Sequence, residues 1–558
     1  MFKLKNFYVI LNNNINSKLT REYKLLLVKQ QQQQPAVTLH FRSTAAAAAL
    51  KNDVNSEANK EWQNAKPFHE MPTMSIFSMI KNFLPGGKYA NLDTNKMMEA
   101  LHKDLGNVAY LPGFLGRKGI VITHNLDDFE VVLRNEGIWP DRPGSETLHY
   151  HRHVHRADFF QGVEGLISTQ GETWGTFRSA VNPVMMQPKN VHLYLHKMSE
   201  VNKEFIERIR QIRDPKTLEV SDTFEEEINR WTLESVSVVA LDKQLGLITK
   251  NRDNPAAKEL FQALNDFFMY SLELEFKPSL WRYYKTKTFK NLMKTLDKIV
   301  DITSSYVNEA IERIEEDRKK GVPEKPENEK SVLEKLIKID KRIASVMAMD
   351  MLMAGVDTTT TTFTGLMLCL AKNPEKQEKL RQEILKILPQ KDSEFDENAL
   401  KNIPYLRACI KESQRIYPLA LGNARAPAND VVISGYRVPK GTQISLCTVS
   451  MIRNSDYYPQ PNVFLPERWL RSNKKTDISS ECPHSLKPSN PFIHLPFGFG
   501  ARSCIGRRIV EMELELGIAR LVRNYQIEFN YPTENAFKGL LINVPNIPLK
   551  FKFTDLDY

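Results

Sequence analysis

The sequence predicts a mainly α-helical fold with small β-sheets (α+β), as one large domain over residues 60–558. Long stretches repeat apolar residues at helical spacing, as in 224–241 and 295–314. Shorter runs alternate like strands near both ends of the chain: 107–110, 119–123, 431–444 and 528–553. The length would allow roughly three or four domains, but no obvious linker divides this part of the chain.

The first 50 residues form a basic leader. They hold seven Lys or Arg residues against one acid, Glu22, and include a glutamine run and five consecutive alanines. The leader supplies most of the formal net charge of +10, so the total charge does not predict a nucleic-acid partner. A basic, acid-poor leader is typical of a mitochondrial transit peptide, and a disordered tail is the alternative. The sequence contains no run of about 18 apolar residues, so no transmembrane anchor is expected.

After the leader, the pattern predicts a helix over 96–104, the two strands at 107–123 and a helix over 126–135. Residues 139–161 lack periodicity and are expected to be irregular. They hold four histidines at alternating positions: His149, His151, His153 and His155. In an irregular segment this spacing is not that of a helical i, i+4 pair, and no acid or cysteine stands at a ligand spacing. These features argue against a metal site there.

Helices are predicted over 171–184 and throughout 199–320, followed by a polar connector at 321–330. In the first of these helices Trp174 and Arg178 are four residues apart and share one face. Residues 267–284 interleave aromatic and aliphatic side chains with Lys277 and Arg282. This stripe predicts either core packing or contact with a membrane surface.

A long apolar helix is predicted from Ser331 or Lys341 to about Lys372, and polar residues interrupt its middle. Buried Asp357 and Thr358 would cost several kcal/mol without partners, so a compensating use is expected. The structural alternative is a Thr hydroxyl that donates to the preceding turn and bends the helix.

The helix predicted over 403–417 opens with Pro404 and carries Glu412 and Arg415 three residues apart. The sequence FLPERW, which contains Arg468, follows downstream. Arg407 and Lys411 lie four residues apart on one face of the same helix. Without further context, such a basic pair is usually only part of a solvated helix surface.

The glycine-rich stretch PFGFGARSCIGRR places one thiol, Cys504, directly before a predicted helix. Its glycines allow a tight turn and close approach to a flat ligand, Phe497 can cover such a ligand, and Arg502 can bind an anionic substituent. A helix N-terminus favours a thiolate. The chain has five cysteines, an odd number with no C-x-x-C pair, which indicates a reducing compartment. The other four, Cys369, Cys409, Cys447 and Cys482, are interpreted as structural.

This stretch fills every position of the signature Phe-x-x-Gly-x-Arg-x-Cys-x-Gly and resembles the haem-binding loop of the cytochrome P-450 family. The motifs W-x-x-x-R, AGVDTT, ExxR and FLPERW precede it in the family order. The leader and the basic pair Arg407 and Lys411 resemble the mitochondrial class, and WPDRPGSE resembles its insect members.

The resemblance implies a cytochrome P-450 fold with one haem domain and haem b, whose iron takes the Cys504 thiolate as axial ligand. It implies that Trp174, Arg178, Arg425 and Arg502 bind haem propionates, and that Gly355 leaves room for dioxygen. Asp357 and Thr358 would relay protons to the oxygen. Glu412, Arg415 and Arg468 would form a buried structural network, and Arg407 and Lys411 would dock an acidic ferredoxin.

The implied function is a monooxygenase that inserts one atom of O2 into a hydrophobic small molecule. Electrons would come from NADPH through a [2Fe-2S] ferredoxin and its reductase, because the chain has no flavin or dinucleotide motif. Peripheral attachment to the matrix face of the inner mitochondrial membrane is expected. Xenobiotic detoxification is favoured as the role, with ecdysteroid hydroxylation possible. The alternatives are a non-catalytic haem protein that binds a lipophile or gas, and a haem isomerase that needs no external electrons.

Overall fold

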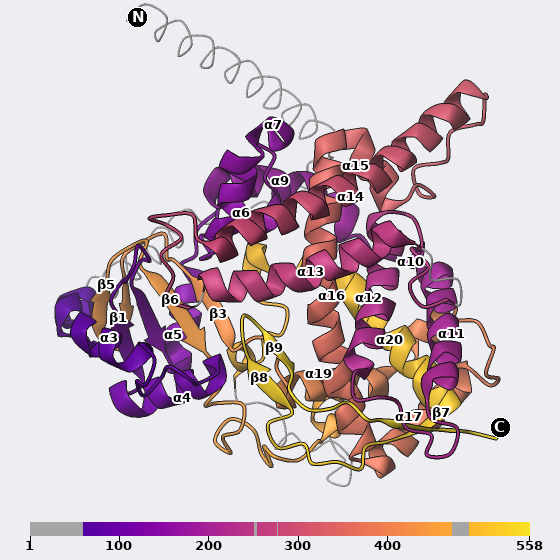
Figure 1. Ribbon diagram of the computed structural model, residues 1–558. Helices are drawn as coiled ribbons and strands as arrows, with labels where there is room; N and C mark the ends of the chain where they lie inside the picture. Colours follow the sequence, from indigo (N-terminus) through magenta and orange to yellow (C-terminus); the bar gives the residue numbers. More distant parts are fainter. Residues whose placement is uncertain (1–59, 250–253, 276, 471–489, 558) are drawn as a thin grey trace, which may run out of the picture. The chain divides into compact units, whose positions relative to one another are not determined.

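The computed structural model describes residues 60–249, 254–275, 277–470 and 490–557. The chain divides into two units, Met1–Asn64 and Ala65–Tyr558, and the second contains every element below. The predicted transit peptide and Cys482 lie outside the described residues. Long helices with small sheets make up the second unit, so the predicted fold class is confirmed (Figure 1).

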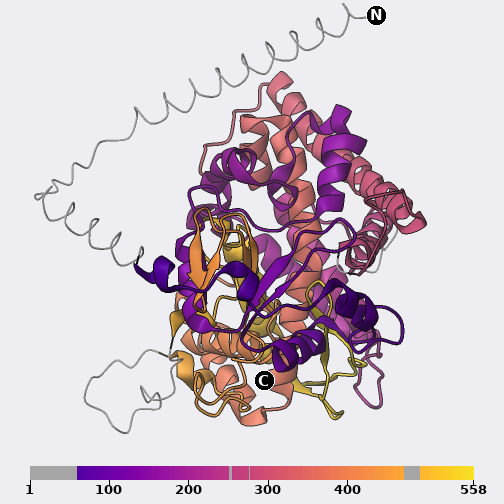
Figure 2. The ribbon, with the colours of Figure 1, turned by 90° about the vertical axis from the view of Figure 1, so that its left-hand side faces the viewer.

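A four-stranded sheet and short helices begin this unit. These elements are η1 (Phe68–Glu70), α3 (Ile76–Phe83), α4 (Thr94–Leu105), β1 (Val108–Leu111), β2 (Ile120–Thr123) and α5 (Leu126–Arg134). The predicted helices and strands are confirmed, and the Asp93 side chain caps α4 by accepting from the backbone of Asn95 and Lys96. The sheet order is β1-β2-β6-β3, in which β6 (Gln443–Cys447) and β3 (Gly422–Arg425) come from later in the chain. β2 pairs in parallel with β6, so Ile122 lies opposite Ser445. Figure 2 looks onto this side of the unit.

The histidine-bearing segment is helical, so the prediction of an irregular segment is wrong. It comprises α6 (Glu146–Tyr150), one π-helical turn, η2 (His151–His155), and α7 (Ala157–Phe160), followed by α8 (Gly165–Ser168), α9 (Gly171–Met185) and α10 (Pro188–His192). Acids that follow the segment pair with its histidines: Glu164 contacts His149 and His153, and the distant Asp297 contacts His151 and His155. Local periodicity could not reveal these tertiary contacts.

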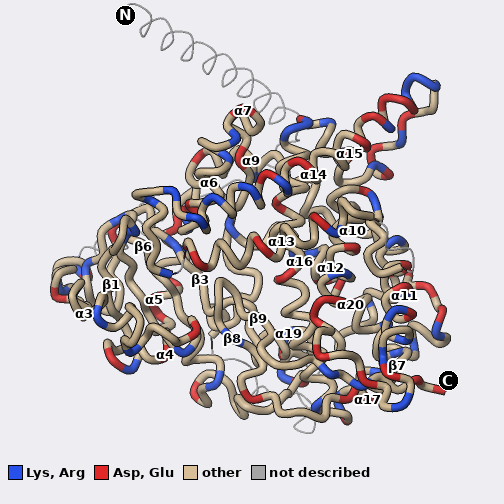
Figure 3. The backbone as a smooth tube through the Cα atoms, in the orientation of Figure 1, with Lys and Arg blue, Asp and Glu red and all other residues tan. Residues whose placement is uncertain are grey.

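Four long helices follow: α11 (Leu195–Ile212), α12 (Phe224–Ala240), α13 (Pro255–Glu275) and α14 (Lys287–Lys319). The prediction of helix throughout 199–320 is too broad, because non-helical connections follow α11, α12 and α13. Pro215 and Pro278 lie in two of these connections, where proline disfavours a continuous helix. Lys and Arg alternate with Asp and Glu along the projecting end of α14, at the upper right of Figure 3.

The core is organised around α16 (Lys341–Ala371), which is buried along most of its length. Its neighbours in sequence are α15 (Val332–Ile339), α17 (Pro374–Ile387), α18 (Glu397–Lys401) and α19 (Pro404–Ile416). Of the two predicted starts, Lys341 begins the long helix, with Asp340 as its cap, whereas Ser331 caps the separate short helix α15. Trp231 of α12 packs on Phe363 of α16 with ring centroids 4.4 Å apart, which fixes α12 against the central helix.

The remaining elements complete the sheets and the cysteine-bearing loop. They are β3 (Gly422–Arg425), β4 (Val431–Ile433), β5 (Tyr436–Val438), β6 (Gln443–Cys447), η3 (Pro466–Trp469), η5 (Pro491–Ile493), η6 (Gly500–Arg502), α20 (Arg507–Asn524), β7 (Tyr525–Glu528), β8 (Phe537–Gly539), β9 (Asn543–Pro545) and β10 (Lys552–Asp555). Antiparallel pairs form between β4 and β5, β7 and β10, and β8 and β9. Strands occur near the chain end as predicted, but Leu541 and Leu549, around which the strands were expected, lie between them.

Candidate active site

Cys504 lies in a tight loop between η6 and α20. The backbone N–H of Cys504 donates to the Phe497 carbonyl at 2.9 Å, which closes the turn. Gly498 and Gly500 have φ angles of +73° and +64°, which favour glycine. A Cβ at Gly500 would also lie 2.0 Å from Oε1 of Glu136. The two glycines therefore meet a conformational requirement and, at Gly500, a packing requirement.

The Cys504 side chain is exposed, yet the protein around it desolvates the thiol and raises its pKa. The backbone N–H of Gly506 and the cations Arg178, Arg142 and Arg507 oppose this rise, but burial outweighs them. The predicted effect of the helix N-terminus is present as the Gly506 N–H, but it is smaller than the opposing effect of burial on the thiol alone. A metal ion that binds the sulfur would displace the proton.

Three guanidinium groups from different elements converge beside this loop. Arg178 of α9 donates from Nη2 to the Ser503 carbonyl at 2.9 Å. Arg425 of β3 donates to Glu136 Oε2 at 2.7 Å and to the Phe499 carbonyl at 3.0 Å. Arg502 lies over the Trp174 ring, 3.9 Å from its centroid. The structure therefore brings together Trp174 and the three predicted arginines.

These arginines form a cationic site with unused donors. Arg178 Nε and Arg502 Nη1 are buried and have no hydrogen-bond partner within the described chain. Burial, and then the neighbouring Arg142, Arg425 and Arg178, lower the pKa of Arg502 to about 9. An anion would supply both the missing acceptors and the missing charge. A cofactor with two carboxylates and a thiolate-binding metal fits these residues.

The middle of α16 presents a small accessible strip in a buried helix. Ala354 is exposed and Thr358 is half-buried, whereas Met353, Val356 and Thr359 are buried. The Thr358 hydroxyl donates to the Ala354 carbonyl at 2.6 Å, the local bond that the structural alternative anticipates.

Asp357 and Gly355 serve different needs in the same strip. Asp357 Oδ2 is buried without a hydrogen-bond partner among the described residues, and burial raises the pKa of this carboxyl to about 6. A Cβ on Gly355 would lie 2.9 Å from Cγ2 of Val236 on α12. In the structure, Gly355 therefore permits close helix packing, a requirement separate from the predicted room for dioxygen.

Comparison with known proteins identifies the family. Residues 77–553 match the family model described as cytochrome P450, which covers most of the chain. The chain belongs to the cytochrome P450 family.

Insect relatives narrow this assignment. This P450 is 70% identical over 500 residues to cytochrome P450 CYP12A2 of Musca domestica, covering 90% of this chain and 93% of that one. It is 59% identical over 518 residues to the probable cytochrome P450 12a5, mitochondrial, of Drosophila melanogaster, covering 92% and 95%. The predictions of a mitochondrial, insect-like P450 monooxygenase and of haem b as its cofactor are confirmed.

A solved structure supports the fold. Retinoic acid bound cyanobacterial CYP120A1 superposes with a TM-score of 0.65 at 19% identity, covering 84% of this P450 and 96% of that chain. Among the helices that the structure describes, none combines the length and the apolar character needed to cross a membrane.

The ExxR helix of this P450 holds a buried ion-pair network. Arg415 donates to both oxygens of Glu412, at 2.8 and 3.1 Å, and Arg468 donates to Oε1 at 3.1 Å. The Trp469 indole adds a bond to Oε2 at 2.8 Å. All three charged side chains are fully buried, so the network joins α19 to η3 inside the protein.

Arg407 and Lys411 lie on α19, as the helical spacing predicts, but Arg407 already has an acidic partner. Its Nε lies 2.6 Å from Glu515 Oε1, and its Nη2 donates to the Leu400 carbonyl at 2.6 Å. Lys411 is exposed. Any docking role of Arg407 must therefore coexist with this ion pair.

Sequence reasoning missed two residues of the P450 site. Glu136 binds Arg425 and occupies the space that Gly500 leaves free. Arg142 lowers the pKa of Arg502 and belongs to the stretch WPDRPGSE, which resembles insect members. That stretch was the one signal that could have pointed to Arg142.

Proposed function

We propose that this P450 hydroxylates hydrophobic small molecules in the mitochondrion, with xenobiotics and insecticides favoured over ecdysteroids. The observation that carries the proposal is the convergence of the Arg178 and Arg502 donors beside Cys504. It supports a bound cofactor at the thiol, and the acid in the middle of α16 supports catalytic use of that cofactor. Family likeness alone supports the preference for xenobiotics.

Cys504 is the proposed axial ligand of the haem iron. Arg178 Nε and Arg502 Nη1 are the proposed donors to the haem propionates. Arg425 and Trp174 are proposed as further propionate partners, and the Trp174 ring also stacks on Arg502. Phe497 is proposed to pack on the cofactor, and the Arg507 guanidinium lies 5.2 Å from its ring centroid. Haem, when bound, supplies the activation of O2 that sends one oxygen atom to the substrate and the other to water.

Asp357 and Thr358 are the proposed proton carriers. Because the pKa of Asp357 is raised to about 6, its carboxyl can both hold and release a proton near neutral pH. The Thr358 hydroxyl donates to Ala354, which leaves its oxygen lone pairs available to accept a proton. A lipophile-binding haem protein would have no use for this pair, so the relay favours the enzyme.

Electrons are proposed to arrive from a ferredoxin, reduced by its reductase and NADPH, at a surface that includes Lys411 and Arg407. Complementary charge would mainly raise the association rate and make it salt-sensitive. Lys411→Gln should lower the ferredoxin-dependent rate at low ionic strength and have little effect at high salt. The exposed Lys338, on α15, provides a matched control as Lys338→Gln. Unchanged kinetics in Lys411→Gln together with Arg407→Gln would refute the docking role.

Peripheral membrane attachment is proposed for α3 and the connection after α13. Phe77 is 79% exposed and Tyr283 is 68% exposed. Arg117, in the β1–β2 turn, donates to the Leu274 and Lys277 carbonyls and so holds this connection beside the sheet. Phe77→Ser with Tyr283→Ser should reduce co-sedimentation with phospholipid vesicles, while Val322→Ser, in the exposed loop after α14, should not.

Reconstituted turnover tests the proposed function. The holoenzyme, a ferredoxin, its reductase and NADPH should convert members of a lipophile panel to products that carry one added oxygen. NADPH consumption without product from either xenobiotics or steroids would favour a binding protein. Substrate-induced spectral shifts across the same panel would decide between detoxification and ecdysteroid hydroxylation.

A further inference from the structure

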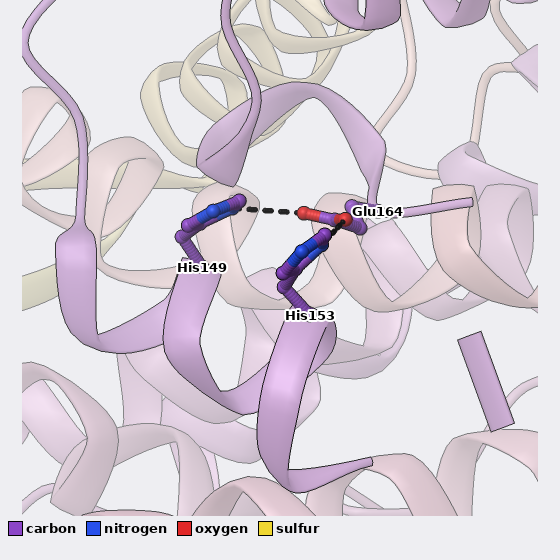
Figure 4. A group of neighbouring side chains, drawn as sticks. All are labelled: His149, His153 and Glu164. Carbon is purple, nitrogen blue, oxygen red and sulfur yellow. Dashed lines mark hydrogen bonds and ion pairs between the residues drawn. The ribbon is translucent and has the colours of Figure 1, made fainter. Parts of the chain in front are cut away.

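The histidine segment forms a three-residue donor set outside the haem site. We propose that His149, His153 and Glu164 bind a divalent transition-metal ion, and that Zn²⁺ fits this set best. His149 and His153 come from α6 and the π-helical turn, and Glu164 immediately precedes α8 (Figure 4).

The two imidazoles are arranged as a chelating pair. Four residues apart, their rings stack with centroids 5.0 Å apart and planes inclined by 17°. The Nδ1 atom of His149 lies 2.8 Å from Glu164 Oε2, and that of His153 lies 2.6 Å from Oε1. The three ligand atoms all lie within 4.8 Å of one another. Ligands of a tetrahedral zinc ion are separated by about 3.3 Å, so small side-chain rotations would open the set around the ion.

The carboxylate is buried and one of its oxygens is underused. The Glu164 side chain is 5% exposed, whereas those of His149 and His153 are 49% and 62% exposed. Oε2 has no well-aligned hydrogen bond from any described residue, although His149 lies close to it as an ion pair. A buried anionic oxygen that faces two accessible imidazoles is a metal ligand with an open approach from solvent.

The backbone beneath Glu164 is held rigidly. Its carbonyl accepts from Ser168 Oγ at 2.7 Å and from Arg152. Asp350 of α16 binds Arg152 at 2.7 Å and the backbone N–H of Leu166 at 2.6 Å. The donor set is therefore preorganised on a support tied to the central helix, which lowers the cost of metal binding.

The neighbouring group of His151, His155 and Asp297 is the matched comparison. Its two contacts to Asp297 are 3.0 Å each, but the Arg156 guanidinium also lies 3.3 Å from the same carboxylate. His151 is 1% exposed. A fixed cation on the carboxylate and one buried imidazole make this second group a poor metal site despite its similar composition.

Zinc binding to the intact, tag-free holoprotein tests the proposal. After chelator treatment and equilibrium dialysis against Zn²⁺, about one zinc per haem should remain bound. His153→Gln should weaken zinc affinity by at least about 100-fold, since loss of even an outer-shell partner costs 10- to 100-fold. His155→Gln should bind zinc like the wild type.

A second readout separates site loss from misfolding. Zinc should slow hydrogen exchange of residues 146–168 in the wild type and in His155→Gln, but not in His153→Gln. Failure of the wild type to bind zinc, or equal binding by His153→Gln, would overturn the proposal. Because His153 is exposed, its variant should keep the Soret spectrum and melting temperature of the metal-free wild type.

Discussion

The guanidinium of Arg502 stacks on the indole of Trp174, 3.9 Å from the ring centroid. The same guanidinium donates to the Pro140 carbonyl at 2.8 Å, the Thr169 carbonyl at 3.1 Å and Gln170 Oε1 at 2.6 Å. One side chain thus ties the cysteine loop to α9 and to the segment before α6. It does so with a planar, forked group that lysine cannot replace.

Arg502→Lys should therefore reduce haem retention while the positive charge is kept. Lysine loses both the stacking and at least two of the three hydrogen bonds, each worth about 1 kcal/mol. The ratio of Soret to protein absorbance after gel filtration should fall, and the melting temperature should drop. Arg508→Lys, at an exposed arginine of α20, is the control and should change neither.

Cys504→Ser should abolish the thiolate-type Soret band of the reduced carbonyl complex. Serine offers no thiolate, so the electronic character of the axial ligand changes even where haem stays bound. Cys409→Ser should leave the band intact, because Cys409 is fully buried in α19. A thiolate-type band that persisted without Cys504 would disprove its assignment as the ligand.

Asp357→Asn should slow turnover and stabilise the protein at neutral pH. The pKa of this carboxyl is raised from 3.8 to about 6, so the folded state binds the proton more tightly than the unfolded chain does. The carboxyl's contribution to stability is therefore greatest below about pH 4 and is lost as the pH rises to about 6. The variant should gain more in melting temperature at about pH 7.5 than at about pH 4.5.

In the same variant kcat should fall by roughly 10²-fold, the typical contribution of general acid catalysis. Thr358→Ala should slow turnover without this pH-dependent gain in stability. A rate for Asp357→Asn equal to that of the wild type would remove the carboxyl from the proposed relay.

Gly355→Ala should destabilise the protein by about 1–3 kcal/mol, because its Cβ would lie 2.9 Å from Cγ2 of Val236. In a Val236→Ala background the same change should become neutral or stabilising, since alanine is the better helix former. Urea unfolding of the four proteins in this double-mutant cycle measures the coupling. Additive effects would show that the two helices do not meet at these residues.

Glu412→Gln should destabilise the holoprotein by about 3–5 kcal/mol, because it leaves two buried guanidinium groups without their carboxylate. The urea midpoint reports this loss. Glu511→Gln breaks a solvent-exposed i, i+4 pair with Arg507 and should cost under about 1 kcal/mol. Similar midpoints for the two variants would contradict a buried network.

The sequence was most informative where the signal is local. The Cys504 loop, the start of α19 at Pro404 and the two starts at Ser331 and Lys341 all follow from turn, cap and periodicity rules. The role of Glu136 could not be predicted, because nothing near it in sequence marks its distant partners, and for Arg142 the stretch WPDRPGSE was the one available signal. The π-helical turn at His151–His155 was missed for the same reason, since its acids lie on other elements.

Two further results, one electrostatic and one steric, also needed the structure. The helix position of Cys504 indicated a thiolate, but the surrounding protein raises the pKa of the thiol. The motif predicted that Gly355 leaves room for dioxygen, whereas Val236 on α12, next to Gly355, shows that the glycine is needed for close helix packing. In both cases the deciding quantity is what surrounds the residue in space.

The contact between Glu136 and Gly500 bears on the order of assembly. The cysteine loop packs against a carboxylate supplied by the N-terminal quarter of the chain, and Arg425 from β3 binds that carboxylate. Contacts between such distant segments form late in folding. A chain truncated before the loop, or one synthesised without its first helices, lacks part of the contact between Glu136, Arg425 and the cysteine loop. Capture of the cofactor is therefore expected as a post-synthetic event that reports whether the whole domain has folded.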